Sequence, residues 1–160
     1  MGFVLIDMDD MKRTKHAAYI KCVSIIDERI AGLKNSIATL LDDAESEMKS
    51  SAGDKHETSR AMMQLEQEKL TYQLAEAENQ KAVLEKINPQ QVLQNVTTGS
   101  LVDTNINTLF FATAMGKINV NGKDVMVLSV QSPLGVALNG KAKGDVVDFN
   151  GRQVEILEVN

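Results

Sequence analysis

The chain has 160 residues, of which 43% are hydrophobic and 4% aromatic, and its formal net charge is −5. This size suits one or two small domains, and the few aromatic residues argue against an aromatic-lined ligand pocket. The single cysteine, Cys22, excludes an internal disulfide, and the two histidines are too far apart in sequence for a zinc motif. No apolar run approaches the roughly 20 residues of a membrane span, so we expect a reducing, cytoplasmic compartment and no membrane partner.

Helix-breaking residues are distributed unevenly along the chain. Both prolines, Pro89 and Pro133, and seven of the ten glycines lie after residue 88. This bias predicts a helical first part and a strand-rich second part that meet at Asn88-Pro89. The sequence thus divides into an N-terminal extension, 1–16, a helical region, 17–87, and a C-terminal domain, 89–160.

The helical region carries apolar residues in two runs with a heptad period. The first run comprises Tyr19, Val23, Ile26, Ile30, Leu33, Ile37, Leu40 and Ala44, and the second comprises Met63, Leu70, Leu74, Ala77, Leu84 and Ile87. This period predicts two helices, 17–49 and 55–87, that pack against each other as an antiparallel coiled coil. Matching apolar residues across the pair makes Ile26 face Ala77 and Leu40 face Met63.

The turn between the two helices is predicted between Lys49 and Asp54, with its tip near 50–57. Gly53 can adopt the positive φ of a turn, and Asp54 can cap the second helix. Each helix would be about 50 Å long at 1.5 Å per residue. We therefore expect the tip to lie far from the rest of the chain.

The second part of the chain is predicted to form a sheet with one helix. Short apolar runs at 109–112, 125–130, 146–149 and 154–159 are accompanied by turn signals at Asn121-Gly122, the strongest, and at Asn150-Gly151. Ser132, Pro133 and Gly140 bracket one short helix, with proline at its first position. Four to six strands and one helix predict the α+β class for the whole chain.

Few residues are candidates for catalysis or for metal binding. No serine has a nearby histidine and acid, and the segment 140–145 lacks the Gly-Lys-Ser/Thr ending of a phosphate-binding loop. Asp54 and Glu57 are the strongest candidates. They fit a helix start, with Glu57 reaching back to the amide of the cap, and they also fit a shared Mg²⁺ site, because Mg²⁺ is often held by one or two carboxylates together with a partner's groups. The two interpretations are compatible.

Two segments resemble the bacterial Gre transcript cleavage factors. Residues 52–57 read AGDKHE at the joint of the two helices, and residues 132–147 read SPLGVALNGKAKGDVV, followed by VEILEV at 154–159. Residues 99–102, GSLV, are similar to the start of that family's C-terminal sheet. The resemblance covers residues 17–160 in order and spacing.

The resemblance implies an N-terminal coiled-coil finger and a C-terminal domain similar to the FKBP fold. It further implies binding to RNA polymerase, with the finger in the secondary channel and indirect contact with the 3′ end of the nascent RNA. Asp54 and Glu57 would help hold the polymerase's second Mg²⁺, and Ser132, Pro133, Leu134 and Gly135 would contact the polymerase. The chain would stimulate RNA hydrolysis by the polymerase without being an enzyme alone, and it would have no stable cofactor and no small-molecule substrate.

The residues after Glu57 depart from the family pattern. Thr58, Ser59 and Arg60 stand where the family usually has Asn or Asp followed by a nearby tyrosine. A Gre-like regulator that occupies the channel without stimulating cleavage is therefore an alternative. A structural coiled-coil assembly protein is a more remote one, because it leaves the C-terminal motif unexplained. A prolyl isomerase is disfavoured by the few aromatic residues of the C-terminal domain.

Overall fold

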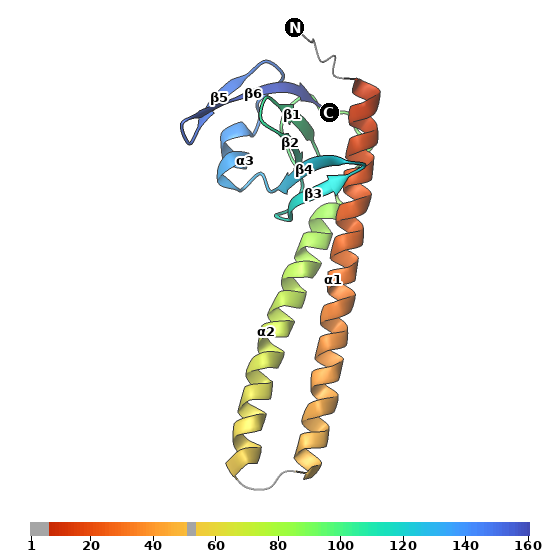
Figure 1. Cartoon of the computed structure of the whole chain (residues 1–160), viewed down its shortest axis with the longest axis vertical. Coiled ribbons are helices and arrows are strands. Elements are labelled where there is room, and N and C mark those ends of the chain that lie inside the picture. Colours follow the sequence, from red (N-terminus) through yellow and green to blue (C-terminus); the bar gives the residue numbers. More distant parts are fainter. Residues whose placement is uncertain (1–6, 51–53) are drawn as a thin grey trace. The chain divides into compact units, whose positions relative to one another are not determined.

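The computed structural model of the protein describes residues 7–50 and 54–160, and their side chains except those of residues 48–50 and 54–56. Two long helices precede a six-stranded sheet and one short helix (Figure 1), which confirms the α+β class. The chain forms two compact units: Ser24–Lys81 is one, and the chain up to Val23 together with Ala82–Asn160 is the other. None of the helices in the described residues has the length and apolar character required to cross a lipid bilayer.

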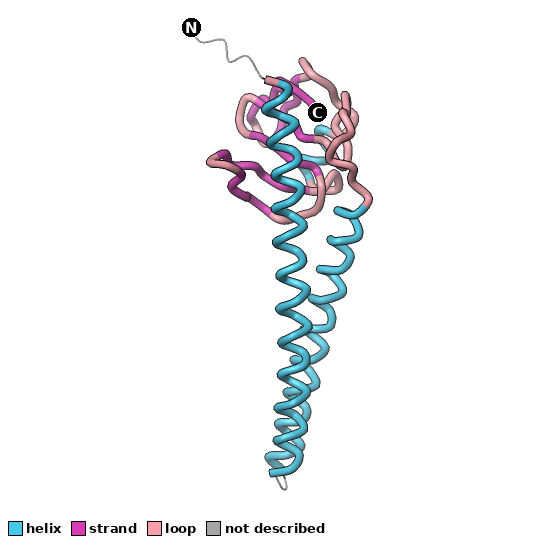
Figure 2. Tube along the Cα trace, turned by 90° about the vertical axis from the view of Figure 1, so that its right-hand side faces the viewer, coloured by secondary structure: helices cyan, strands magenta, loops and turns pink. Residues whose placement is uncertain are grey.

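Helix α1 spans Met8–Ser50 and helix α2 spans Asp54–Glu85. Within the unit Ser24–Lys81 the two helices run side by side in both views (Figures 1 and 2). Gly53, the predicted turn residue, lies outside the described residues. The end of α1 and the start of α2 each lie within one residue of the predicted positions, 49 and 55.

Helix α1 begins at Met8, well before the expected residue 17. Its first turns bury Met11, Ala18 and Cys22, at a spacing that continues the helical stripe toward Ile26. The predicted helix did not extend to these residues because Lys15 occupies the buried position between Met11 and Ala18, and lysine is almost never fully buried.

The helical pair has a thin seam. Ile26 and Ala77, one of the expected facing pairs, are buried, while Ile30, Leu33 and Leu70 are half-buried. A pair of helices without further layers cannot cover more of its apolar surface, because each seam residue has neighbours on one side only.

Polar contacts across the seam differ from the expected register. Lys81 Nζ lies 2.7 Å from Asp27 Oδ1, and Arg29 Nη1 donates a hydrogen bond to Gln80 Oε1 over 3.1 Å. Matching the apolar residues had paired Asp27 with positions 76–77. Lys81 lies four to five positions further along α2, so the contacts are shifted by about one helical turn. Because apolar residues recur every three or four positions, a shift of one turn still leaves apolar residues facing each other, and the sequence test could not detect it.

The sheet has the order β3-β4-β2-β1-β6-β5. Its strands are β1 (Leu101–Thr104), β2 (Thr108–Phe111), β3 (Gly116–Val120), β4 (Lys123–Leu128), β5 (Val146–Phe149) and β6 (Arg152–Val159). Strands β2 and β4 pair in parallel, and the other neighbours pair antiparallel. The predicted number of four to six strands is confirmed at its upper limit.

Two hairpins close on Asn-Gly turns. Asn121 and Gly122 have φ values of 52° and 83°, and Asn150 and Gly151 have values of 51° and 78°. Positive φ at both central residues gives a turn whose twist matches that of the flanking strands, which is why Asn-Gly is favoured there. The Asn-Gly signals thus correctly predicted the turns at 121–122 and 150–151.

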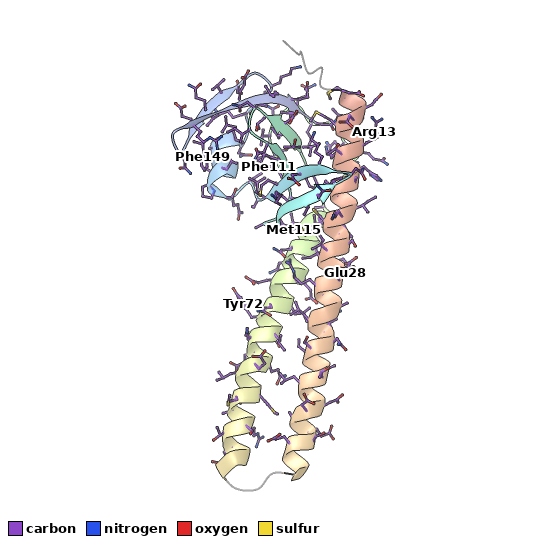
Figure 3. All side chains as sticks on the ribbon, viewed as in Figure 1. Arg13, Glu28, Tyr72, Phe111, Met115 and Phe149 are labelled. Carbon is purple, nitrogen blue, oxygen red and sulfur yellow. The ribbon has the colours of Figure 1, made fainter. Side chains whose placement is uncertain are left out.

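The core of the sheet unit is continuous. Its buried residues are Val96, Val102, Leu109, Phe111, Leu128, Leu138, Val154, Ile156 and Val159. Helix α3 (Pro133–Leu138) contributes Leu138 to this cluster, and Phe111 points from β2 into it (Figure 3). The neighbouring Phe110 is also fully buried. Adjacent residues of a strand point to opposite faces, so β2 is covered on both sides.

Candidate functional site

The two predicted acids open helix α2. Asp54 is its first residue, four positions after α1 ends at Ser50, and Glu57 lies in its first turn with an exposed side chain. Residues three positions apart on a helix lie on the same face, so positions 54 and 57 share one face of α2. The side chain of Asp54 lies outside the described residues, and so does the predicted capping contact between the two acids.

The rest of the described chain offers no other metal site. Among the side chains of residues 7–47 and 57–160, no group of three or more histidine, cysteine, aspartate or glutamate side chains could hold a metal ion. Two carboxylates on one helical turn leave most positions around a Mg²⁺ ion to water or to another molecule. Any metal chemistry at Asp54 and Glu57 therefore requires groups beyond these described side chains.

The segment 132–135 opens helix α3. Ser132 Oγ accepts a hydrogen bond of 3.1 Å from the amide of Gly135 and donates one of 2.7 Å to the carbonyl of Ser129. Pro133 follows at the first helical position, where its missing N–H costs nothing. The segment thus forms the predicted helix start.

Gly135 has a packing reason for being glycine. A Cβ atom there would lie 2.2 Å from the carbonyl oxygen of Ser129 and 2.7 Å from Cα of Val130. Ser132 and Gly135 therefore have roles inside the fold that need no partner. On the surface of this helix, Pro133 and Val136 are exposed and Leu134 is half-buried. Of the four residues predicted to contact a partner, Pro133 is thus the most accessible.

The segment 140–145 connects α3 to β5. Asp145 Oδ2 accepts a hydrogen bond of 2.8 Å from the amide of Ala142, and Asn95 Nδ2 donates one of 3.0 Å to the carbonyl of Gly140. Gly140 and Gly144 both have positive φ. This is a tight connection, and the alternative of a phosphate-binding loop has no support in its geometry.

Sequence reasoning missed Lys15. Its side chain is fully buried, and Nζ donates hydrogen bonds to the carbonyls of Gln91, over 2.7 Å, and Asn160, over 2.9 Å. Burial lowers the pKa of Lys15 to about 8, because the charged form loses solvation. The helical spacing from Met11 to Ala18 was the signal that could have found it.

Two grooves follow the helical pair. One, of about 260 Å³, is lined by Leu40, Leu41, Ala44, Glu47, Arg60, Met63, Gln64 and Gln67, and the other by Arg29, Leu33, Gln73, Glu76, Ala77, Asn79 and Gln80. Neither groove brings together a nucleophile and a base. They are surface features of the seam and contain no candidate for catalysis.

Comparisons with known proteins do not assign this chain to a family. No protein-family model and no curated protein matches the chain. Among solved structures, that of the transcription factor Gfh1 is 17% identical in sequence, with coverage of 90% of this chain and 94% of that chain and a TM-score of 0.34. Superposition at that level establishes neither a shared fold nor a shared activity.

Proposed function

We propose that this protein binds RNA polymerase and stimulates the polymerase's own hydrolysis of backtracked RNA. The finger formed by α1 and α2 would enter the secondary channel, and the C-terminal domain would supply most of the affinity. The resemblance of residues 52–57 and 132–147 to the Gre factors supports this proposal, because two separate segments match in order and spacing.

The observation that carries the proposal is the position of Asp54 and Glu57. They open α2 where the helical pair reverses, and Glu57 is exposed. A second catalytic Mg²⁺ stabilises the attacking and leaving oxygens of a phosphoryl transfer, and two added carboxylates would help to hold it beside the polymerase's own ligands. The chain alone would have no nuclease activity.

A polymerase-binding regulator without cleavage activity is the second candidate. Arg60 stands three positions after Glu57 and is exposed, so a positive charge lies one helical turn from the second acid. This charge reduces the attraction of Glu57 for a cation. Occupation of the channel would then inhibit or modulate the polymerase without help from the tip acids.

The test is cleavage of RNA in a purified, backtracked elongation complex. The wild-type chain should accelerate cleavage in a Mg²⁺-dependent manner, and Asp54→Asn should reduce that acceleration at least tenfold while binding to polymerase is retained. Asparagine caps a helix about as well as aspartate, so this change removes the charge without weakening the helix start. Glu57→Gln should have a similar effect.

The outcomes separate the candidates. Binding with no cleavage by the wild-type chain would favour the regulator, and Arg60→Ala should then be tested for a gain of cleavage. Wild-type cleavage by Asp54→Asn would show that the carboxylate is only a cap. Failure of the full chain to bind polymerase would overturn both candidates and favour a coiled-coil assembly protein.

A further inference from the structure

The C-terminal domain contains three asparagines that are followed directly by glycine: Asn121, Asn139 and Asn150. All three are exposed. Asparagine before glycine is the pair most prone to spontaneous deamidation, because glycine has no side chain that hinders attack by its own amide nitrogen on the asparagine side chain. Since the three pairs are identical in sequence, a difference in their reactivity has to come from the structure around them.

Deamidation needs no reactant other than water. The backbone nitrogen of the glycine loses its proton and forms a bond to Cγ of the asparagine, and the side-chain nitrogen takes up that proton and leaves as ammonia. Water then opens the resulting cyclic succinimide to aspartate or to isoaspartate, depending on which carbonyl it attacks. A hydrogen bond donated by the glycine amide slows the first step, because the nitrogen must give up that proton and turn toward the side chain.

The three glycine amides differ in their hydrogen bonds. The amide of Gly122 donates to Oδ1 of Asn119 over 3.1 Å, and the amide of Gly140 donates to the carbonyl of Val96 over 2.8 Å. The amide of Gly151 donates no hydrogen bond to any group in the described part of the chain. Two of the three nitrogen nucleophiles are therefore held by acceptors, and the third is not.

The two hairpins that close on Asn-Gly turns are also anchored differently. In the β3–β4 hairpin, Ile118 and Val120 are buried, and Lys21 Nζ of α1 donates a hydrogen bond of 2.6 Å to the carbonyl of Asn119. In the β5–β6 hairpin, β5 lies at the edge of the sheet, pairs only with β6, and has no fully buried side chain (Figure 1). A strand with so little burial opens locally more often, which lets the turn reach the geometry of ring closure.

We propose that Asn150 is a site of spontaneous deamidation, and that in the folded chain it reacts faster than Asn121 and Asn139. The product carries an added negative charge at the end of the β5–β6 hairpin. Isoaspartate also lengthens the main chain of the turn by one carbon atom, because the chain then runs through the former side chain. A two-residue turn with positive φ at both positions does not accommodate that atom, so isoaspartate at this position weakens the pairing of β5 with β6.

Peptide mapping by mass spectrometry tests the proposal on the full chain incubated under mildly alkaline conditions. Deamidation at Asn150 should be at least fivefold faster than at Asn121 and at Asn139. In concentrated urea the three rates should agree within about twofold, because the unfolded pairs are equivalent. Equal rates at Asn150 and Asn121 in the folded chain would overturn the proposal, and so would an order of rates that persists in urea.

A matched pair of variants tests the role of the hydrogen bond. Asn119→Ala removes the acceptor of the Gly122 amide and keeps the backbone carbonyl that Lys21 contacts, so deamidation at Asn121 should become at least threefold faster. Asp148 is the equivalent residue of the other hairpin, is exposed, and does not accept from Gly151. Asp148→Ala is therefore the control and should change the rate at Asn150 less than twofold.

An unchanged rate at Asn121 in Asn119→Ala would overturn the explanation by hydrogen bonding. Digestion with a protease that cleaves before aspartate but not before isoaspartate separates the two products at Asn150. Isoaspartate there should increase hydrogen exchange in β5, and unchanged exchange would contradict the expected weakening of the hairpin. No polymerase is present in these experiments, so their outcomes do not depend on the proposed function.

Discussion

The two units of the chain bury their apolar residues very differently. Among the described residues of Ser24–Lys81, the fully buried apolar side chains are Ile26 and Ala77, and the rest of the seam is at best half-buried. In the other unit β2 is buried along its whole length, and Phe110 and Phe111 are both inaccessible. Because stabilisation scales with the apolar area removed from water, stability is concentrated in the sheet unit, and the helical pair should open first.

Adding one methyl group to each unit gives the largest expected difference in stability between the two units. Gly135→Ala pushes a Cβ atom against the carbonyl of Ser129 and should lower the free energy of unfolding by about 3 kcal/mol or more. Gly32→Ala meets no atom within 4 Å and lies inside a helix, so it should raise stability by about 0.5–1 kcal/mol. Urea unfolding followed by circular dichroism measures both. Similar effects of the two changes would contradict the contrast.

Truncating one leucine in each unit measures the depth of the two cores. Leu109→Ala removes a fully buried side chain and should cost about 3 kcal/mol, whereas Leu33→Ala, at a half-buried seam position, should cost about 1 kcal/mol. Hydrogen exchange should show that Leu33→Ala raises exchange within 24–81 and leaves β2 protected. Loss of protection in β2 would mean that the two units unfold together.

Alkaline pH isolates the contribution of Lys15 to the sheet unit. Its pKa is about 8 in the folded chain and 10.5 in the unfolded one, so between these values the unfolded chain binds more protons. Stability then rises with pH through this window, by at most about 1.4 kcal/mol for each pH unit. The unfolding free energy of the wild type minus that of Lys15→Met should therefore increase from pH 8 to pH 10.5.

Comparison with Lys15→Met is needed because Cys22 acts in the opposite direction. Burial raises its pKa to about 11, so the folded chain keeps this proton longer than the unfolded one, and stability falls above pH 9. Both chains contain Cys22, and its effect cancels in the difference. A difference that does not change with pH would show that Lys15 titrates normally.

The smallest effect concerns the cap of α3. Ser132→Ala removes the hydrogen bond to the amide of Gly135 and should cost about 1 kcal/mol. Ser36→Ala, at an exposed position inside α1, should be neutral or slightly stabilising because alanine is the better helix former. Thermal unfolding of both variants measures this, and a neutral Ser132→Ala would remove the structural explanation for that serine.

Local signals predicted much of the fold. The Asn-Gly turns at 121–122 and 150–151, the cap at Ser132 and the helix break before Asp54 each depend on a few neighbouring residues, and each was correct. Strand β3 was not predicted, although the turn that follows it was, because Gly116–Val120 includes no apolar run. The parallel pairing of β2 with β4 depends on contacts distant in sequence, which no local pattern encodes.

The candidate site shows the same division. The position of Asp54 and Glu57 at the start of α2 followed from helix-capping rules. Lys15 did not follow from its type, because its burial depends on two carbonyl groups contributed by distant parts of the chain.

The hydrogen bond from Lys15 to Asn160 joins residues 145 positions apart. Closing such a long loop from a disordered chain is slow, and each doubling of its length adds about 0.6 kcal/mol of entropy cost. The salt bridge between Asp27 and Lys81 reduces the effective length of this loop, because it brings the two ends of the segment 27–81 into contact. Early formation of the helical pair should therefore accelerate assembly of the sheet, and loosening the pair should slow refolding more than it lowers the final stability.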